Sequence, residues 1–189
     1  FVNFYKYIFS VAYPNDDNEY DKNIWDIRKL GIPFNTAVSR TRYTINFTCI
    51  QQDWFRSIVK EYAYYRLQNK TVASVIDDLK ALRIFSEFLI KEKPCLTSLK
   101  ELNRNTIEEY YNFLNNKGFV TTTYNHRISA LRTFFYVCNM LDIDEVPQKP
   151  IIMYSDYRKI PYNLPKCFSD SELKQMNEHI GDLPIQIGR

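Results

Sequence analysis

The spacing of hydrophobic residues changes near residue 48, and the change divides the chain into a weakly periodic part and a helical part. Residues 1–7 alternate aromatic and polar side chains, as a half-buried strand does, and residues 43–47 indicate a second strand. Residues 25–30 predict a short helical turn ending at Gly31, because glycine adopts the left-handed conformation that often follows a helix. We therefore expect an irregular N-terminal extension with short strands.

Beyond residue 48, hydrophobic residues recur at steps of three and four, which is the period of one helix face. Thr48 and Gln51 predict a capping box at the start of the first helix. Pro94 stops the second helix, Asn103 caps the third, and Gly118 follows the end of the third. The predicted helices span residues 48–68, 71–93, 104–116 and 121–141.

The hydrophobic stripes of these helices predict one shared core and therefore a mainly α fold built on a four-helix bundle. On the first helix, Lys60 and Arg66 are expected on the face opposite the stripe. On the fourth helix, an angle of about 100° per residue places a polar set on the outer side, made of Thr122, Asn125, His126, Ser129 and Thr133. The inward residues are predicted to be Ile50, Trp54, Ile58, Tyr62, Tyr65, Val75, Leu79, Leu82, Phe85, Leu89, Ile107, Tyr110, Tyr111, Leu114, Tyr124, Ile128, Leu131, Phe135 and Cys138.

The last part of the sequence predicts a basic, extended linker and one more helix. Proline recurs between residues 147 and 165, which favours extended backbone. Ser169 and Glu172 form a second capping-box pattern, from which a helix is predicted to run to about Ile180. The expected organisation is an extension at 1–47, a helical domain at 48–146, a linker at 147–168 and the first helix of a further domain at 169–189.

Composition excludes several classes of protein. With four glycines, no glycine-rich phosphate-binding loop can be written anywhere in the sequence. Four cysteines without a C-x-x-C pattern and two histidines argue against a zinc site; free thiols are favoured over two disulfides. The free thiols favour a reducing cytoplasm as the location. No run of 18 apolar residues is present, so no membrane span is expected. The chain begins without Met and stops without an end signal, so we expect a piece of a longer protein with no signal peptide.

The sequence predicts no enzyme active site and no cofactor. Adjacent acidic residues, such as Asp77 and Asp78, point about 100° apart on a helix and do not share a site. His126 and Cys138 would lie about 18 Å apart on one helix, too far for a nucleophile and its base.

DNA binding and protein interaction both remain open on composition. Net charge is nearly even along the chain, which lacks the strong basic footprint of many DNA-binding domains. Hydroxyls, helix N-terminal amides and basic side chains nevertheless gather on two helices and in the linker, where they could bind phosphates or base edges. The predicted DNA-binding residues are Lys70, Thr71, Lys80, Arg83, Thr122, Thr123, Asn125, His126, Arg127, Ser129, Arg132 and Lys159. The alternative is a helical protein-interaction or oligomerisation module, for which exposed Tyr64 and Tyr136 would argue.

Four stretches together resemble the tyrosine recombinase (phage integrase) family. Residues 123–135, TYNHRISALRTFF, resemble the family's "T.NRRLSALRSFF" helix. Residues 71–89 resemble its "T…L..F..FL" line, and residues 102–111 its "LTR..I..Y" helix. Residues 163–173 resemble the linker and first helix of the catalytic domain. Two earlier stretches, 25–31 and 46–54, look like the lead-in of transposon-encoded members.

The resemblance implies a SAM-like core-binding domain that grips double-stranded DNA for integration and recombination. In the family, this domain and the catalytic domain clamp the duplex, and the full protein assembles as a tetramer and forms a 3′-phosphotyrosyl link. The catalytic set has no counterpart here, because no Thr-Gly occurs for a "TG.R..E" motif and neither histidine is followed by Arg three residues later. The chain also has His126-Arg127 where the family has two basic residues. We therefore expect no catalytic residue in this chain, and a recombinase as the full-length parent.

Overall fold

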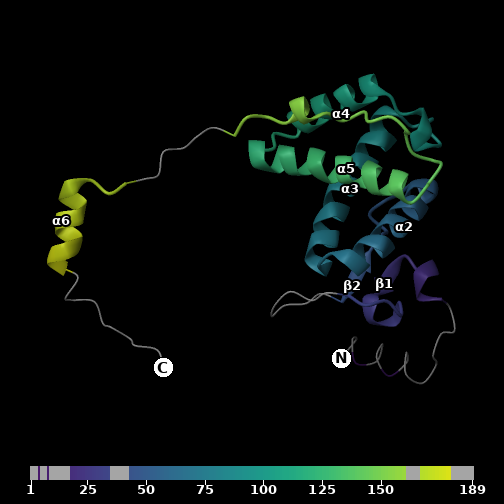
Figure 1. Ribbon diagram of the computed structural model, residues 1–189, viewed down its shortest axis with the longest axis horizontal. Coiled ribbons are helices and arrows are strands. Elements are labelled where there is room, and N and C mark those ends of the chain that lie inside the picture. Colours follow the sequence, from purple (N-terminus) through teal and green to yellow (C-terminus); the bar gives the residue numbers. More distant parts are fainter. Residues whose placement is uncertain (1–3, 5–7, 9–17, 35–42, 161–166, 180–189) are drawn as a thin grey trace. The chain divides into compact units, whose positions relative to one another are not determined.

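The computed structural model describes residues 4, 8, 18–34, 43–160 and 167–179, and the described part is mainly α-helical (Figure 1). The chain divides into two compact units, residues 1–158 and 159–189. Within the described residues, the first unit contains a two-stranded sheet and four long helices, and the second contains one helix. The helices are α2 (Asp53–Asn69), α3 (Val72–Glu92), α4 (Arg104–Asn116), α5 (Thr121–Met140) and α6 (Asp170–His179).

Side-chain caps fix the predicted starts of α3 and α4. The Thr71 hydroxyl accepts a hydrogen bond from the Ser74 amide, and the Asn103 side chain accepts one from the Thr106 amide. These bonds satisfy amide groups that have no partner within the helix. Gly118 follows α4 with a φ of 69°, which is the left-handed conformation predicted for it. The predicted bounds of these two helices are confirmed to within one residue.

The predicted start of α2 at Thr48 is wrong. Both the amide and the hydroxyl of Thr48 donate to the Asn46 side chain, at 2.8 and 2.7 Å, so Thr48 belongs to a turn after the second strand. This turn buries Ile50 outside the helix, and α2 begins at Asp53. The cap-like spacing of Thr48 and Gln51 therefore describes a turn, and not a helix end.

The N-terminal part of the first unit is a small antiparallel hairpin. Strand β1 (Ile24–Asp26) pairs with β2 (Thr44–Asn46), and Trp25 lies opposite Ile45. The predicted second strand is confirmed, whereas the predicted helical turn at 25–30 is half strand and half 3-10 helix (Ile27–Lys29). Asp26 explains the change, because its side chain accepts from the Arg28 amide and caps the 3-10 turn.

Most of the strand predicted over residues 1–7 lies outside the described residues. Phe4, which falls within it, is helical, so the prediction is wrong at that position. Phe1, Phe4 and Ile8 are three and four residues apart, a helical spacing that also fits this short aromatic segment.

A continuous aromatic core joins the hairpin to the helices. Trp25 packs on Phe47 with ring centroids 4.5 Å apart, and Phe55 of α2 contacts both Phe85 of α3 and Phe134 of α5. All five side chains are fully buried. The predicted inward residues of α3, α4 and α5 are buried as expected, whereas Trp54 and Tyr65 of α2 are only half-buried.

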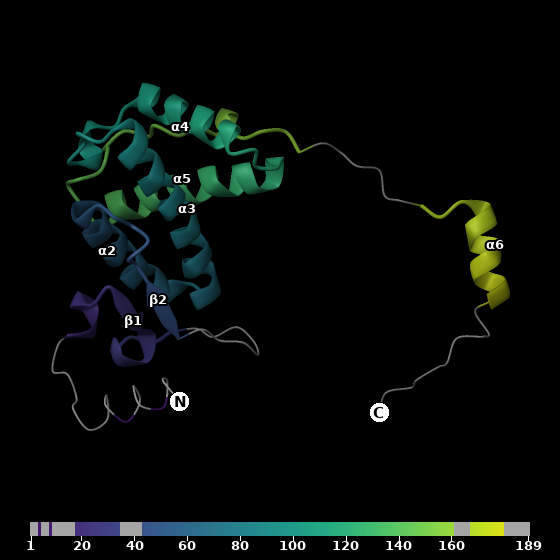
Figure 2. The same cartoon turned by 180° about the vertical axis from the view of Figure 1, so that it is seen from behind.

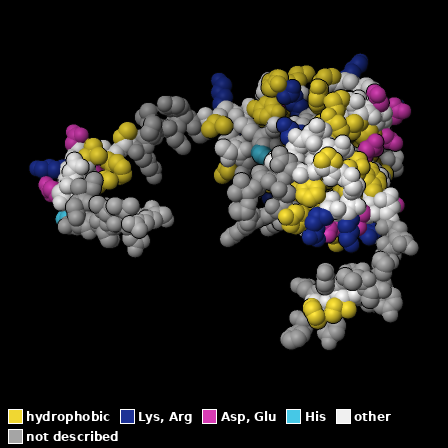
Figure 3. All heavy atoms as spheres, turned by 60° about the horizontal axis from the view of Figure 1, so that its bottom comes forward, with side chains coloured by type: hydrophobic (Ala, Val, Ile, Leu, Met, Phe, Trp, Pro, Cys, Tyr) yellow, Lys and Arg dark blue, Asp and Glu magenta, His cyan; other side chains and the backbone are white. Residues whose placement is uncertain are grey.

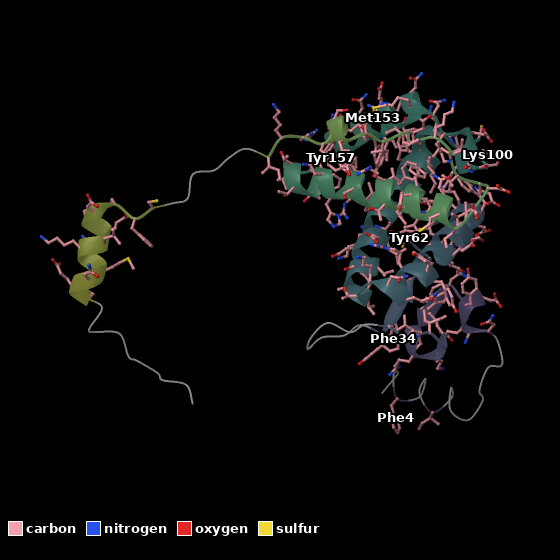
Figure 4. The ribbon with its side chains drawn as sticks, viewed as in Figure 1. Phe4, Phe34, Tyr62, Lys100, Met153 and Tyr157 are labelled. Atoms are coloured by element: carbon pink, nitrogen blue, oxygen red, sulfur yellow. The ribbon has the colours of Figure 1, made fainter. Side chains whose placement is uncertain are left out.

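Two charged residues of the α2–α3 pair lie inside the protein. Lys60, predicted on the solvent side, is buried, and its ammonium donates to the Asp21 carbonyl at 2.9 Å. Its long stem covers hydrophobic surface while its charge meets a backbone acceptor, which the helix period does not anticipate. Asp78 accepts from the Tyr62 hydroxyl at 2.8 Å and from Arg66 at 2.9 Å. Tyr62 lies in the middle of the helical bundle in Figure 4.

Residues 147–158, predicted as linker, pack on the first unit and are called the return segment below. In Figures 1 and 2 this segment runs back along α4 and α5, from the last turn of α5 to its first. Asn139 donates to the Pro147 carbonyl at one end, and Asn125 donates to the Arg158 carbonyl at the other. Ile152 is buried between these ends.

Asp156 anchors the return segment to α4. It accepts two hydrogen bonds from Arg104, at 2.6 and 2.7 Å, and one from the Tyr111 hydroxyl at 2.7 Å. The Met153 amide donates a fourth bond from within the segment itself. The Arg104 guanidinium, by these bonds, lowers the pKa of the Asp156 carboxyl to about 2.

The second unit contributes the exposed helix α6. Its predicted capping box is confirmed, since the Ser169 amide donates to Glu172 and the Glu172 amide donates to the Ser169 hydroxyl. The predicted end near Ile180 lies outside the described residues. Within the part of the chain that the structure describes, none of the helices combines the length and the hydrophobicity of a membrane-spanning segment.

The four cysteines are free thiols with different degrees of exposure. Cys95 and Cys167 are exposed, Cys49 is half-buried, and Cys138 lies fully inside the core on α5. Burial raises the pKa of the Cys138 thiol well above its ordinary value.

Candidate nucleic-acid interface

The outer side of α5 carries a polar stripe in its first half. Thr122, His126 and Ser129 are exposed and follow one another at helical steps of four and three. Thr123 and Thr133 border this stripe and are half-buried. Of the five residues predicted on the outer side, Thr122, His126 and Ser129 are confirmed as exposed, whereas Asn125 and Thr133 are half-buried. Their role in binding stays a prediction.

The first turn of α5 lacks the side-chain cap that α3 and α4 possess. Its N-cap residue is Val120, whose side chain has no acceptor and makes no cap hydrogen bond. The three threonines at 121–123 bring hydroxyls to the same turn. Free amide groups and the positive end of the helix dipole favour an anion at such a place.

Asn125 holds the return segment. Its side-chain amide donates to the Arg158 carbonyl and its oxygen accepts from the Arg158 amide, both at 2.8 Å. The Arg158 guanidinium lies 3.8 Å from the centre of the Tyr124 ring and also donates to Asn115. Asn125, predicted as a DNA-binding residue, is thus engaged in a local structural contact.

Arg132 packs on the return segment as well. Its guanidinium carbon lies 3.9 Å above the Tyr154 ring, and hydrogen bonds with Tyr154 and Tyr157 raise its pKa. Tyr157 lies beside the first half of α5 in Figure 4, and Met153 lies further back along the segment. The charge of Arg132 remains, but the side chain is fixed on the flank of α5.

Arg127 turns toward the interior. It is half-buried, and its Nε atom is buried without a hydrogen-bond partner among the described residues. The buried hydroxyl of Tyr110 is also unpaired, and the charge of Arg127 acts on Tyr110. The predicted DNA-binding residue Arg127 therefore lies partly inside the helical unit.

The predicted residues around α3 fall into two groups. Thr71 uses its hydroxyl to cap α3, next to Lys70, which is exposed at the end of α2. Lys80 and Arg83 are exposed one turn apart near the middle of α3. Lys80 pairs with Asp77 at 2.6 Å, whereas Arg83 forms no ion pair among the residues that the structure describes.

Lys159, the last predicted residue, is exposed and belongs to the second unit. Sequence reasoning missed two basic side chains of the first unit, Arg104 and Lys149. Arg104 is engaged with Asp156, and Lys149 is exposed on the return segment. Lys149 lies within the predicted basic linker at 147–168, and this basic composition was the signal that could have identified it.

Charge is dispersed over the first unit. Figure 3 shows Lys and Arg side chains at several separate places on the face it displays, with a group at the lower edge beside Asp and Glu side chains. Several of the basic side chains are neutralised, for example Lys80 by Asp77 and Arg66 by Asp78. The even charge distribution of the sequence is thus retained in the structure.

The second half of α5 differs from the first. Tyr136 is 70% exposed and Met140 is 46% exposed. Between this half and the return segment lies a groove of about 510 Å³, which Phe135, Pro150 and Ile151 line. Tyr64 is half-buried against Tyr20 and Trp25, so of the two tyrosines proposed to mark a protein-binding surface only Tyr136 is fully exposed.

The chain is similar to proteins encoded by transposons. It is 35% identical over 174 residues to transposase B from transposon PsiTn554 of Staphylococcus aureus, and equally to transposase B from transposon Tn554 of that species. No protein-family model and no solved structure matches it. The similarity covers 91% of this chain and 28% of each transposase, so the chain spans less than a third of the length of these relatives.

Proposed function

We propose that this chain is the DNA-gripping part of a transposon-encoded recombinase that acts in DNA integration and recombination. The observation that carries the proposal is the 35% identity to two transposases across 91% of the chain. The tyrosine recombinase chemistry, the core-binding role of the helical unit and the tetrameric assembly rest on the family resemblance. The chemistry and the assembly belong to the full-length protein, whose catalytic part would supply the nucleophile.

The geometry of α5 supports contact with DNA. Its first turn offers amide groups without a side-chain cap, together with the exposed Thr122. His126 and Ser129 continue the same face as polar, compact side chains. Amides and hydroxyls bind phosphates, while the side chains behind them can approach base edges in a major groove that admits a helix.

Contacts with phosphates are enough to make DNA binding depend on the salt concentration. The logarithm of the affinity falls by about 0.9 per unit of log salt for each phosphate neutralised. Because the net charge of the chain is only +3 at pH 7, we expect a shallow salt dependence and weak binding by the chain alone.

The test is an anisotropy titration of fluorescein-labelled duplex DNA, using a transposon-end sequence and a mixed sequence at low salt. We expect Thr122→Ala to weaken binding about three- to tenfold, the cost of one or two lost hydrogen bonds. Tyr136→Ala, on the other half of α5, is the matched control and should bind as the wild type does. Failure of the wild type to bind either duplex would contradict the proposal.

One observation favours a second function, a protein-interaction surface on the second half of α5. Tyr136 and Met140 are exposed beside the groove that Pro150 and Ile151 line. Aromatic residues and methionine are enriched at protein interfaces. Loss of self-association in Tyr136→Ala, with unchanged DNA binding, would assign this half to partner contact and leave the first half to DNA.

A further inference from the structure

A second groove lies between the hairpin and α3, away from the stripe on α5. It has a volume of about 490 Å³ and is lined by β2, by Cys49 after it, and by α3 from Ile76 to Arg83. The buried side chains of Ile45 and Leu79 form apolar parts of its wall. Figure 2 shows α3 reaching the hairpin beside β2. A volume of this size is typical of a site for a small ligand group.

The polar lining of this groove consists of donors. Thr44 and Asn46 are exposed on β2, and Lys80 and Arg83 are exposed on α3. The side-chain oxygen of Asn46 already accepts both bonds from Thr48, which leaves its Nδ2 group, a donor, unpaired among the described residues. Among the residues that the structure describes, no acidic side chain lines the groove. A ligand with several acceptor oxygens and negative charge matches such a lining.

Arg83 is the charged group that this groove leaves uncompensated. Asp77 offsets the charge of Lys80 at 2.6 Å, but no carboxylate of the described residues pairs with Arg83. The guanidinium also acts on Cys49 across the groove, favouring the thiolate, although burial dominates and raises the pKa of that thiol. The charge of Arg83 is therefore felt at the hairpin side of the groove.

The hairpin wall is held firmly in place. Trp25 and Phe47 are fully buried at its base, and the Trp25 indole donates to the Tyr20 carbonyl at 2.9 Å. Asp26 binds Arg28 through two hydrogen bonds, and the Arg28 guanidinium lies 4.9 Å from the centre of the Tyr43 ring. A donor placed on such a wall is ordered before binding, which lowers the entropic cost of a contact.

We propose that this groove holds a phosphate of the DNA backbone, bound by Arg83 from α3 and by Thr44 and Asn46 from the hairpin. The inference rests on the proposed DNA-binding function and adds the hairpin to the part that grips the duplex. It gives residues 43–47 a role in positioning DNA that the resemblance to the family does not supply. Lys80, paired with Asp77, contributes less than Arg83.

The test combines three variants with the anisotropy titration of a labelled duplex. Arg83→Gln removes the charged donor, and Thr44→Val removes the hydroxyl while keeping a β-branched side chain. Lys100→Gln, in an exposed segment far from the hairpin in Figure 4, removes the same charge as a control. We expect about three- to tenfold weaker binding for Arg83→Gln and a salt slope smaller by about 0.9, with a smaller loss for Thr44→Val. Lys100→Gln should match the wild type.

Neutral methylphosphonate linkages locate the contact. Replacing the bound phosphate should weaken the wild type and leave Arg83→Gln unaffected, because the same interaction is already lost. A midpoint temperature of thermal unfolding equal to that of the wild type shows that the fold of each variant is intact. If the wild type and Lys100→Gln bind while Arg83→Gln binds equally well, the groove is not a phosphate site. An unchanged Thr44→Val beside a weakened Arg83→Gln overturns the role of the hairpin. Absence of binding by the wild type contradicts the proposed function instead.

Discussion

Two aspartates of the first unit receive the same types of donor, an arginine and a tyrosine, yet they hold very different parts of the chain. Asp78 joins α2 to α3 through Tyr62 and Arg66, which lie 16 and 12 residues away in sequence. Asp156 joins the return segment to α4 through Tyr111 and Arg104, which lie 45 and 52 residues away. The first network lies within a pair of packed helices, and the second secures a segment that contains a single 3-10 turn (Tyr154–Asp156).

The difference predicts how each network fails. Loss of Asp78 leaves a charged guanidinium and a hydroxyl unpaired inside the bundle, and no local motion brings water to both. Loss of Asp156 leaves Arg104, 36% exposed and still paired with Glu108, within reach of solvent, and it loosens the return segment around residue 156. The same chemistry is therefore expected to control global stability at one site and local order at the other.

The largest effect is expected for Asp78→Ala. Removing one partner of a buried ion pair costs about 3–5 kcal/mol of the free energy of unfolding. Urea unfolding followed by circular dichroism measures this loss. The neighbouring Asp77→Ala breaks only the exposed pair with Lys80 and should change stability by about 0–1 kcal/mol. Equal effects of the two variants would show that burial of the Asp78 network is unimportant.

A smaller and more local effect is expected for Asp156→Ala. We expect a loss of about 1–3 kcal/mol, because the groups left behind can regain water. Hydrogen exchange should speed up in residues 151–158 and stay unchanged in α2 and α3. Ser155→Ala alters an exposed neighbour and should leave the exchange pattern as it is. Uniform acceleration across the unit in Asp156→Ala would mean that the two networks are not separable.

The smallest effect concerns pH. Arg104 lowers the pKa of Asp156 to about 2 in the folded chain, against about 3.9 for an unperturbed aspartate. The folded state therefore gains stability above about pH 4, and this gain is lost as the pH falls toward 2. We expect the lost part to be about 1–2 kcal/mol, given the partial exposure of Arg104. The free energy of unfolding, measured at pH 5 and below, should show this loss. Asp156→Asn should reduce the fall in stability over this pH range. An unchanged fall would exclude Asp156 as its source.

Local signals in the sequence predicted the helices well. Thr71 and Asn103 cap α3 and α4, and Ser169 with Glu172 starts α6, because each cap acts over three residues. The start of α2 was missed because Asn46, two residues before Thr48, takes both donors of that residue. A cap pattern cannot show that a neighbouring side chain binds its members first.

Contacts over long sequence distances were not predictable in this way. The return segment reads as a linker because of its prolines, and its partners Arg104, Tyr111 and Asn125 lie more than thirty residues earlier. The same limit applies to the site: the helix period placed Thr122, His126 and Ser129 outward, but it could not show that Asn125 and Arg132 hold the return segment. The groove beside β2 arises from two segments that only the tertiary fold brings together.

Cys138 gives the protein an internal reporter of its own opening. The thiolate is the form that reacts with alkylating agents. Burial keeps the Cys138 thiol, on α5 inside the protein core, protonated and out of reach. Cys95 and Cys167, both exposed, react without any opening of the fold. The chain therefore carries thiols that an alkylating agent labels at once and a thiol that it labels only when the helices separate. The labelling of Cys138 thus reports the opening of the fold without a reporter group being introduced into the protein.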